Sequence, residues 1–391
     1  MSVGHDLTIM TNDKLLSQTI SYLRFPLTVG VVFIHFNLAK SPFSMHGVKY
    51  GLDNPDWYSN LIRFLSEVLP SIAVPLFFLI SGFLFFYKTE FDQTSYKRKL
   101  HTRARTLLVP FVLWNIIALL TKAVRMIPAL SPIFPNAYKT EVHFSLGHIL
   151  NTFYDGRSGI LITPVEDLMT EVNNNPFPTN VPMWYVRDLI IMVLLAPVIY
   201  WMIKKAGAWF VVAMGIVWYF MKPIFFPTGA YPVLLSTALF FFSWGAYFSI
   251  NRQNFVEILR KFKFAPLVYL PIAVADMLTK KTGYTLYIHQ LGILVGIVSA
   301  VVIVSYLLEQ EKIKVNSTLA NASFFVFALH TLVMYDIGKV IFTALHLPDT
   351  TSAMLMLYFA VPTITILLCL GLYLLLKKYI PSVCNLLTGG R

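Results

Sequence analysis

Charged residues are scarce in this chain of 391 residues, and their scarcity excludes most classes of protein. They make up 13% of the sequence, whereas a soluble fold carries roughly 25%. Hydrophobic residues make up 57%, so little polar surface remains to keep a folded chain dissolved. Ordinary soluble, disordered and fibrous proteins are therefore excluded, and the composition indicates a membrane protein.

Cysteines and nucleotide-binding motifs are also few or missing. The two cysteines, Cys369 and Cys384, are too few for a disulfide-rich scaffold. No phosphate-binding glycine loop is present, which argues against an ATP-driven pump. No spacing among the nine histidines, the cysteines and the carboxylates is typical of a metal site. We therefore expect no bound metal and no permanently bound cofactor.

Long apolar runs are what the chain has instead. A transmembrane helix needs about 20 mostly apolar residues, and about ten segments approach that length. The seventh is the weakest, because Pro266 and Pro271 interrupt it and Asp276 lies near its end. The sequence therefore predicts an all-α, polytopic membrane helical bundle. The predicted spans are 20–38, 71–87, 107–123, 184–203, 208–226, 233–250, 264–279, 287–308, 323–345 and 354–377.

Lysine and arginine residues are distributed unevenly between the predicted loops. The segment 88–106 alone carries six of them, and basic residues favour the cytoplasmic side. Placing that segment inside puts the N-terminus and the C-terminus inside as well. Residues 1–19 are then a cytoplasmic arm, 20–378 the transmembrane domain and 379–391 a short cytoplasmic tail. The net charge of +12 is thus an orientation signal, and we expect no nucleic-acid partner.

The first predicted span carries two ionisable side chains. Arg24 and His35 are eleven positions apart, so on a helix they share one face and lie about 16 Å apart along the axis. Ionisable groups at membrane depth usually face a cavity or a partner. Alternatively, Arg24 snorkels to the inner boundary and His35 only hydrogen-bonds a neighbouring helix. The aligned pair favours a channel, because histidine moves protons near neutral pH.

The second and third predicted spans add small and basic residues. Ser81 and Gly82 lie in the middle of the second span, where small residues let another helix approach closely. A nucleophilic role for Ser81 is less favoured, since no G-x-S-x-G elbow surrounds it. Arg103 and Arg105 open the third span, and guanidinium groups grip phosphate bidentately. The alternative is that both only serve the positive-inside rule.

The fourth predicted span begins with aromatic and charged residues. Trp184 and Tyr185 are typical of an aromatic belt at the outer boundary. Arg187 and Asp188 follow just within that boundary. They either form a local salt bridge or belong to an outer entrance for an acceptor, and the sequence leaves both interpretations open.

Two histidines lie in later spans. His330, in the ninth, is more typical of packing and hydrogen bonding than of catalysis, although catalysis stays an alternative. His289, in the eighth, has no companion motif, and we interpret it as structural or as a lining residue.

Five short motifs occur in order along the chain. Each motif alone is weak, but together on about ten spans they make the chain resemble the acyltransferase-3 family of integral membrane acyltransferases over nearly its whole length. The motifs are R-x10-H from Arg24 to His35, FFLISGF around Ser81, Arg103-Ala104-Arg105, MWYVRDL around Arg187, and FFVFALH ending at His330.

The resemblance implies an activity. Similar proteins move an acyl group, often acetyl, from cytosolic acyl-CoA (acetyl-CoA) to a hydroxyl of a cell-envelope or surface carbohydrate, in the bacterial cytoplasmic (inner) membrane. It also implies that His35 is the catalytic base, that Arg24 is its partner, and that Arg103 and Arg105 contact CoA. The remaining candidate substrate-binding residues are Ser81, Trp184, Arg187, Asp188 and His330.

The resemblance also bears on partners. We expect acyl-CoA, a carbohydrate acceptor and the lipid bilayer to be partners, whereas the oligomeric state is left undetermined. Some relatives carry a hydrolase-like periplasmic domain after the membrane part. Because this sequence ends at Arg391, we expect no such domain, and whether a separate periplasmic protein supplies its role stays open.

A competing hypothesis is a carrier. Membrane-buried histidine and arginine on about ten spans also suit a proton-coupled membrane exporter of glycan or small molecules. Many transporters contain inverted repeats, and no internal repeat is visible in this sequence. The ordered motifs therefore favour the acyltransferase.

Overall fold

The computed structural model describes residues 3–45, 48–130, 140–162, 176–225, 232–279 and 285–390, without the side chains of 3–12, 221–225 and 232–234. These residues are mainly helical, as predicted, and the strands form two small two-stranded antiparallel sheets. The first half comprises α1 (Val3–His35), β1 (Phe43–Met45), β2 (Val48–Tyr50), α2 (Asp56–Arg63), η1 (Phe64–Val68), η2 (Leu69–Ile72), α3 (Ala73–Phe86), α4 (Gln93–Arg103), η3 (Ala104–Leu108), α5 (Val109–Arg125), η4 (Pro128–Leu130), β3 (Glu141–Val142), α6 (Leu146–Tyr154), η6 (Gly156–Ser158), β4 (Leu161–Ile162) and η8 (Val181–Met183). The second half comprises α7 (Trp184–Ala206), α8 (Ala208–Phe225), α9 (Pro232–Ile250), α10 (Phe255–Arg260), α11 (Ala265–Thr279), α12 (Leu286–Glu309), α13 (Ser317–Ala344), α14 (Thr351–Tyr379) and α15 (Pro381–Thr388).

Every predicted span overlaps a helix in the described part of the chain. Six helical stretches are long and apolar enough to cross a membrane, and three shorter apolar helices accompany them. Helix α1 is not among the six. A multi-pass helical bundle is therefore established, whereas a count of ten crossings stays a prediction. The six stretches are Asp56–Phe86, Gln93–Arg125, Val181–Ala206, Leu286–Glu309, Ser317–Ala344 and Thr351–Tyr379.

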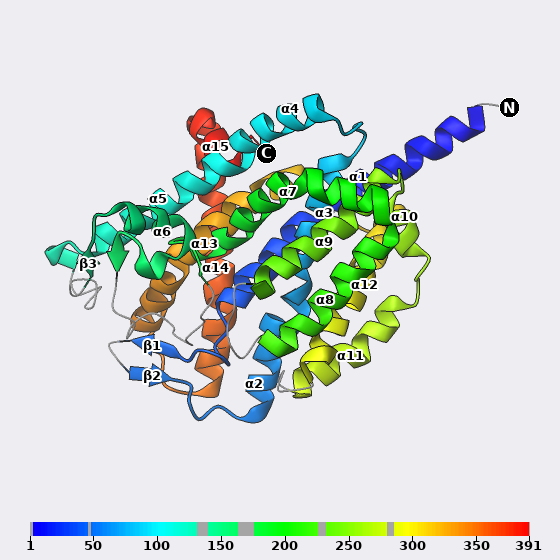
Figure 1. Cartoon of the computed structure of the whole chain (residues 1–391). Helices are drawn as coiled ribbons and strands as arrows, with labels where there is room; N and C mark the ends of the chain where they lie inside the picture. The colour runs from blue at the N-terminus through cyan, green and yellow to red at the C-terminus, as the bar shows by residue number, and fades with distance from the viewer. Residues whose placement is uncertain are drawn as a thin grey trace.

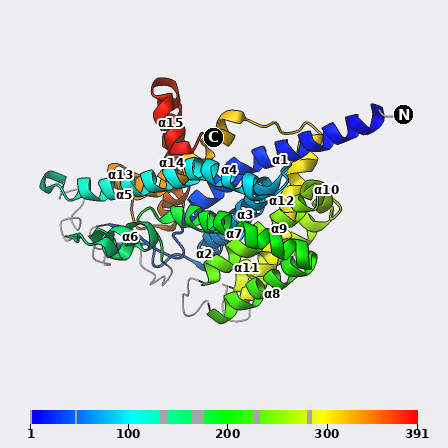
Figure 2. The same cartoon turned by 45° about the horizontal axis from the view of Figure 1, so that its top comes forward.

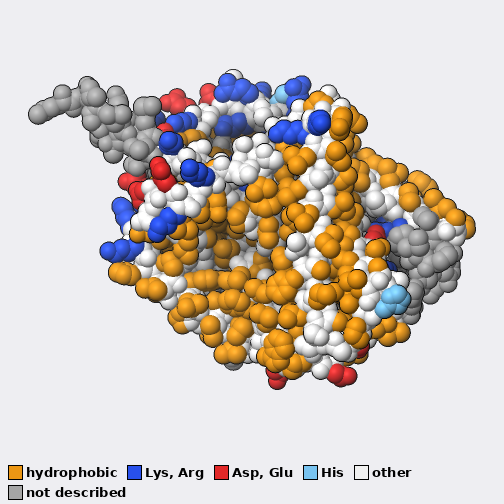
Figure 3. Space-filling model, turned by 180° about the vertical axis from the view of Figure 1, so that it is seen from behind, with side chains coloured by type: hydrophobic (Ala, Val, Ile, Leu, Met, Phe, Trp, Pro, Cys, Tyr) orange, Lys and Arg blue, Asp and Glu red, His pale blue; other side chains and the backbone are white. Residues whose placement is uncertain are grey.

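Both ends of the chain lie at one edge of the bundle. Helix α4 lies at this edge too, whereas β1, β2 and α2 lie at the opposite edge (Figure 1). Viewed from behind, Lys and Arg side chains gather along the first edge, and hydrophobic side chains cover the face below it (Figure 3). This separation is the pattern that a bilayer imposes on a spanning protein.

Helices α4 and α5 form one long rod at the surface of the bundle, with α15 beside it (Figures 1 and 2). The rod begins at a capping box, in which Asp92 accepts a hydrogen bond from the Ser95 backbone while the Ser95 hydroxyl accepts one from the Asp92 backbone. The bond from the Ser95 backbone lowers the pKa of the Asp92 carboxyl. The cap therefore sets where the rod starts, at Gln93, well before the predicted third span 107–123.

Helices α3 and α9 cross with their backbones almost in contact. A Cβ atom on Gly82 would collide with the Phe242 carbonyl group, and one on Gly245 would collide with the Leu79 carbonyl group. Small residues permit such close crossings in membranes. The prediction that Ser81 and Gly82 admit a neighbouring backbone is confirmed, and the neighbour is α9.

The predicted terminal segments are both helical. Helix α1 begins at Val3, so the predicted arm 1–19 is largely the first part of the same helix as the first span. The predicted tail 379–391 contains α15, in which Cys384, Leu387 and Thr388 are buried. Neither segment is an irregular extension in the part that the structure describes.

Candidate active site

A narrow cavity of about 150 Å³ lies inside the bundle. Residues from α1, α3, η3, α7, α9 and α13 form its wall, together with Arg103 at the end of α4. Most of the wall is apolar, and the polar side chains that reach it are Arg24, Thr28, Ser81, Arg103, Tyr185, Asn321 and Ser323. The fold therefore brings Arg24, Ser81 and Arg103, which are far apart in sequence, to one cavity.

Arg24 reaches the cavity from the middle of α1. It is half-buried, and one turn later the buried Thr28 hydroxyl donates to the Arg24 carbonyl oxygen at 3.0 Å and lines the same wall. A guanidinium group in this position does not snorkel freely to a membrane surface. The sequence interpretation in which Arg24 faces a cavity is the one that the structure shows.

Arg103 and Arg105 are separated by the start of a π-helical turn, η3. Arg103 lines the cavity, whereas Arg105 is exposed and is not part of its wall. The π-helical turn contains one extra residue relative to an α-helical turn, so it redirects the side chains that follow it. Arg103 and Arg105 therefore lie in different environments, although the R-x-R motif groups them together.

Ser81 and Tyr185 meet across the cavity. Their hydroxyl oxygens are 3.1 Å apart, and both residues line the wall with Arg24 and Arg103. The prediction that Tyr185 belongs to an outer aromatic belt is wrong for this side chain. The Tyr185 side chain faces the cavity because the residues just before it are buried, as the contacts of Asn180 show.

Asn180 fastens this segment inside the bundle. Its backbone N–H donates to the Asn115 side chain at 3.0 Å, and its side-chain amide donates to the Ala328 carbonyl at 2.9 Å. Helix α7 therefore begins within the bundle rather than at its rim. Hydropathy does not reveal this, because residues 176–183 contain three prolines and lie between the predicted third and fourth spans.

His35 and His330 lie against each other one layer beyond the cavity. Their ring centroids are 5.2 Å apart, and neither residue belongs to the cavity wall. Phe327 connects the two regions, because it lines the cavity and its ring centroid is 6.4 Å from that of His330. A common channel was predicted for Arg24 and His35, but only Arg24 lines the cavity. Phe327 separates the cavity from the two histidines.

Hydrogen bonds fix the tautomer of His330. Its Nδ1 lies 2.8 Å from the Phe327 carbonyl oxygen and 3.2 Å from that of Val326. Carbonyl oxygens only accept, so Nδ1 carries the proton and Nε2 presents a lone pair in the neutral ring. Nε2 is fully buried and has no hydrogen-bond partner among the described residues. Such a nitrogen is able to accept a proton.

His35 is positioned by its neighbours at the end of α1. It is half-buried, and its carbonyl oxygen accepts a hydrogen bond from the Tyr335 hydroxyl of α13 at 2.7 Å. Two residues later, Asn37 donates to the Glu67 carboxylate at 2.7 Å and accepts from the Ala39 backbone. Glu67 was not among the candidate residues of the sequence analysis. It lies in η1, which is a π-helical turn like η3.

Arg187 and Asp188 form the local salt bridge that the sequence left as one alternative. The Arg187 Nε lies 2.9 Å from the Asp188 carboxylate, and both side chains are buried. Arg187 also donates to the carbonyl oxygens of Tyr154 and Pro176. The arginine therefore holds the segment after α5 against α7. Neither residue is part of the cavity wall.

Trp184 packs between aromatic side chains at the start of α7. Its ring centroid is 6.5 Å from that of Phe78 and 6.5 Å from that of Phe177. The indole is half-buried and outside the cavity wall. A substrate contact for Trp184 stays a prediction.

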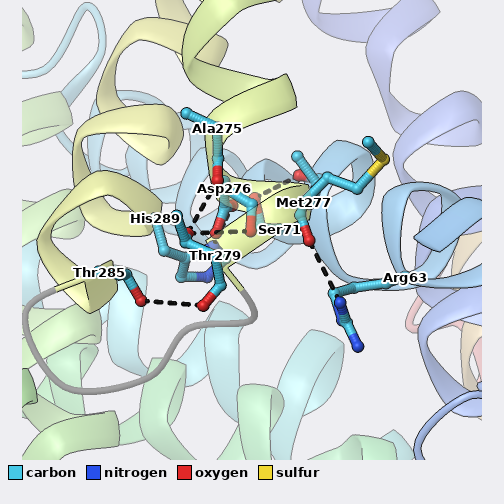
Figure 4. A network of polar contacts seen from close by, with 9 residues as sticks. Arg63, Ser71, Ala275, Asp276, Met277, Thr279, Thr285 and His289 are labelled. Carbon is cyan, nitrogen blue, oxygen red and sulfur yellow. Dashed lines mark hydrogen bonds and ion pairs between the residues drawn. The ribbon is translucent and has the colours of Figure 1, made fainter. Parts of the chain in front are cut away.

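A second buried polar cluster lies between α11 and α12. Asp276 and His289 point toward each other (Figure 4), with His289 Nδ1 2.7 Å from an Asp276 carboxylate oxygen. Arg63 of α2 donates to the Met277 carbonyl oxygen beside them. None of these residues lines the cavity. His289 partners the carboxylate that weakened the seventh predicted span, and a structural role for the pair stays a prediction.

We expect Asp276→Ala to destabilise the protein strongly. Removing the carboxylate takes away the buried hydrogen-bond acceptor of His289 Nδ1, a loss that costs about 1–3 kcal/mol, and more where the lost partner is charged. Thermal unfolding of the purified protein in detergent measures the loss, with Asp53→Ala, at an exposed position, as the control. An unchanged unfolding temperature for Asp276→Ala would contradict a structural role for the pair.

The described residues contain no group of three or more histidine, cysteine, aspartate or glutamate side chains that could hold a metal ion. The polar groups that line the cavity are guanidinium, hydroxyl and amide groups, and the imidazoles of His35 and His330 lie beyond Phe327.

A known protein and a protein family resemble this chain. The chain is 28% identical over 395 aligned residues to the succinoglycan biosynthesis protein ExoH of Rhizobium meliloti (strain 1021), covering 97% of this chain and 94% of that protein. No solved structure matches it significantly. The family model described as an acyltransferase domain matches residues 18–374, which include the cavity, both histidines and all five motifs. The chain therefore belongs to the acyltransferase-3 family of integral membrane acyltransferases.

Proposed function

We propose that the protein transfers an acyl group, with acetyl as the expected group, from cytosolic acyl-CoA to a hydroxyl of a cell-envelope or surface polysaccharide. One observation carries the proposal: two guanidinium groups, Arg24 and Arg103, reach a narrow cavity that ends one side chain away from the histidine pair His35 and His330. Family membership supports acyl transfer, and similarity to a succinoglycan biosynthesis protein supports a polysaccharide acceptor.

The size of the cavity favours an extended donor. Pockets that bury a whole drug-sized ligand measure about 300–1,000 Å³, whereas this one measures about 150 Å³. It suits a narrow chain rather than a nucleotide. The acyl-pantetheine arm of the donor would therefore enter, while the nucleotide and its phosphates stay at the mouth among the basic residues of α4.

The basic edge of the bundle indicates the direction of entry. Lys and Arg gather at the edge that also holds α4 and both chain ends (Figures 1 and 3). Cytoplasmic loops are enriched in these residues, so this edge faces the cytoplasm in our proposal. The membrane is then the bacterial inner membrane, and the acceptor approaches from the opposite edge, on the side of the Arg187–Asp188 pair.

The histidine pair would supply the proton transfer. The acceptor hydroxyl oxygen attacks the thioester carbonyl carbon, the hydroxyl proton passes to His35, and the carbon–sulfur bond breaks. The proton returns to the leaving thiolate, which releases free CoA. The fixed Nε2 lone pair of His330 lies beside His35 and offers the proton an alternative acceptor. No covalent intermediate is required.

Arg24 and Arg103 would bind the donor rather than the reacting carbonyl. Arg24 is about three helical turns from His35, or about 16 Å along the axis, which is too far for contact with one reacting centre. Ser81 and Tyr185 lie opposite the two arginines. Their hydroxyl groups would hydrogen-bond the amides of the pantetheine arm.

The function is tested with purified protein, isotopically labelled acetyl-CoA and a bacterial exopolysaccharide. We expect transfer of label to the polysaccharide and stoichiometric release of free CoA. Free CoA should also raise the unfolding temperature, because a ligand that binds only the folded state stabilises it. Absence of both transfer and stabilisation would contradict the proposal.

Substitution of the two arginines of the R-x-R motif should have unequal effects. Arg103→Gln removes a charge-assisted hydrogen bond worth about 1.5–3 kcal/mol, so the donor KM should rise about 10-fold to 100-fold. Arg105→Gln, at an exposed position outside the cavity, should raise it less. Steady-state kinetics with varied donor measure both values. An unchanged KM in both variants would mean that these arginines only orient the protein in the membrane.

A further inference from the structure

The last described residues of the chain pack directly behind the turn that presents Arg103. Gly389, which ends α15, adopts a left-handed conformation with φ of 69°. A Cβ atom at this position would collide with the backbone of Thr106 in η3. Leu107, the next residue of η3, lines the cavity. The chain end and the cavity therefore contact adjacent residues of the same turn.

A buried hydrogen bond holds α15 in this place. The Trp114 indole N–H of α5 donates to the Leu387 carbonyl oxygen at 2.9 Å, and both side chains are buried. The Trp114 ring packs edge-on against Phe325 of α13, with centroids 5.3 Å apart. The end of α15 is thus fixed relative to two helices of the bundle, α5 and α13.

The turn that follows Arg103, η3, has an unusual hydrogen-bond pattern, and its surroundings support it. In η3 the Val109 N–H bonds to the Ala104 carbonyl, five residues earlier, which is the π-helical pattern. Single π-helical turns within α-helices are uncommon and are frequent at functional sites. Gly389 supplies a backbone contact to η3, on Thr106.

We propose that the C-terminal helix α15 and Gly389 set the position of Arg103 and Leu107 and thereby the affinity for the acyl donor. Gly389 and Trp114 are then positioning residues, because neither lines the cavity. This inference rests on the proposed donor site. It assigns to the segment after the family match, which ends at residue 374, a role in donor binding.

Two adjacent glycines provide the test. Gly389 and Gly390 have φ values of 69° and 71°, so alanine is similarly strained at either position. A Cβ atom at Gly390 meets nothing within 4 Å, whereas one at Gly389 meets Thr106. Gly389→Ala should therefore raise the donor KM about tenfold or more, since a displacement of about 1 Å can cost up to 10²-fold. Gly390→Ala should leave the donor KM close to the wild-type value.

Trp114→Phe provides a second variant in case Gly389→Ala is poorly recovered. It keeps an aromatic ring and removes the hydrogen bond to Leu387. The donor KM should rise while kcat at saturating donor changes little, a split that general destabilisation would not produce. Hydrogen exchange of residues 104–108 should increase in both variants, with or without CoA.

The outcomes separate the two proposals. An active wild-type protein whose donor KM is the same in Gly389→Ala, Trp114→Phe and Gly390→Ala would overturn the role of α15 alone. A wild-type protein that neither transfers the acyl group nor binds CoA would overturn the proposed function and, with it, the donor-binding role of α15.

Discussion

His35→Ala is expected to lower the rate of acyl transfer about 10²-fold to 10⁴-fold, the range that a positioned general base contributes. The variant should insert and fold normally, because the side chain is half-buried and the hydrogen bond from Tyr335 uses the His35 backbone carbonyl. The donor KM should stay near the wild-type value, since His35 is not part of the cavity wall. Initial rates at saturating donor and acceptor measure the effect.

Two further histidine variants make this result specific. His148→Ala changes a half-buried histidine of α6 that lies outside the cavity wall and should retain full activity. His330→Ala removes the ring that contacts His35 and should lower kcat, to a smaller extent if His35 is the base. A well-folded His35→Ala protein with wild-type kcat would exclude His35 from the chemistry. In that case a large loss in His330→Ala would assign the base to His330.

Gly82→Val is expected to prevent correct folding. The new side chain would lie against the Phe242 carbonyl group of α9, and neither backbone can move aside without separating the two helices. Overpacking of an interior costs typically about 1–3 kcal/mol, and a collision between two backbones belongs at or beyond the upper end. Because proteins are stable by only about 5–15 kcal/mol, most of the variant should be aggregated or degraded.

Size-exclusion chromatography in detergent and thermal unfolding measure this effect. Gly371→Ala is the matched control, because Gly371 lies inside α14 with nothing within 4 Å of an added Cβ. Alanine is favoured over glycine in a helix by about 1 kcal/mol, so this control should be as stable as the wild type or more so. Monodisperse Gly82→Val protein with an unchanged unfolding temperature would contradict the close crossing of α3 and α9.

The local sequence determined several features of this protein without any coordinates. Apolar runs predicted helices at all the proposed spans, because burying a backbone in lipid requires its hydrogen bonds to close within the segment. The small pair at Ser81 and Gly82 predicted a close helix crossing, and the ordered motifs indicated the family. Each of these rests on composition or on spacing along the chain.

The tertiary structure alone decided which polar groups meet. Tyr185 faces Ser81 because Asn180 carries its segment into the bundle, and Arg103 is separated from Arg105 by a π-helical turn. His35 meets His330, and Gly389 supports the turn beside the cavity, across separations of hundreds of residues. Hydropathy and spacing describe one helix at a time, whereas these contacts depend on how helices pack, and that packing is set by side chains of many segments at once.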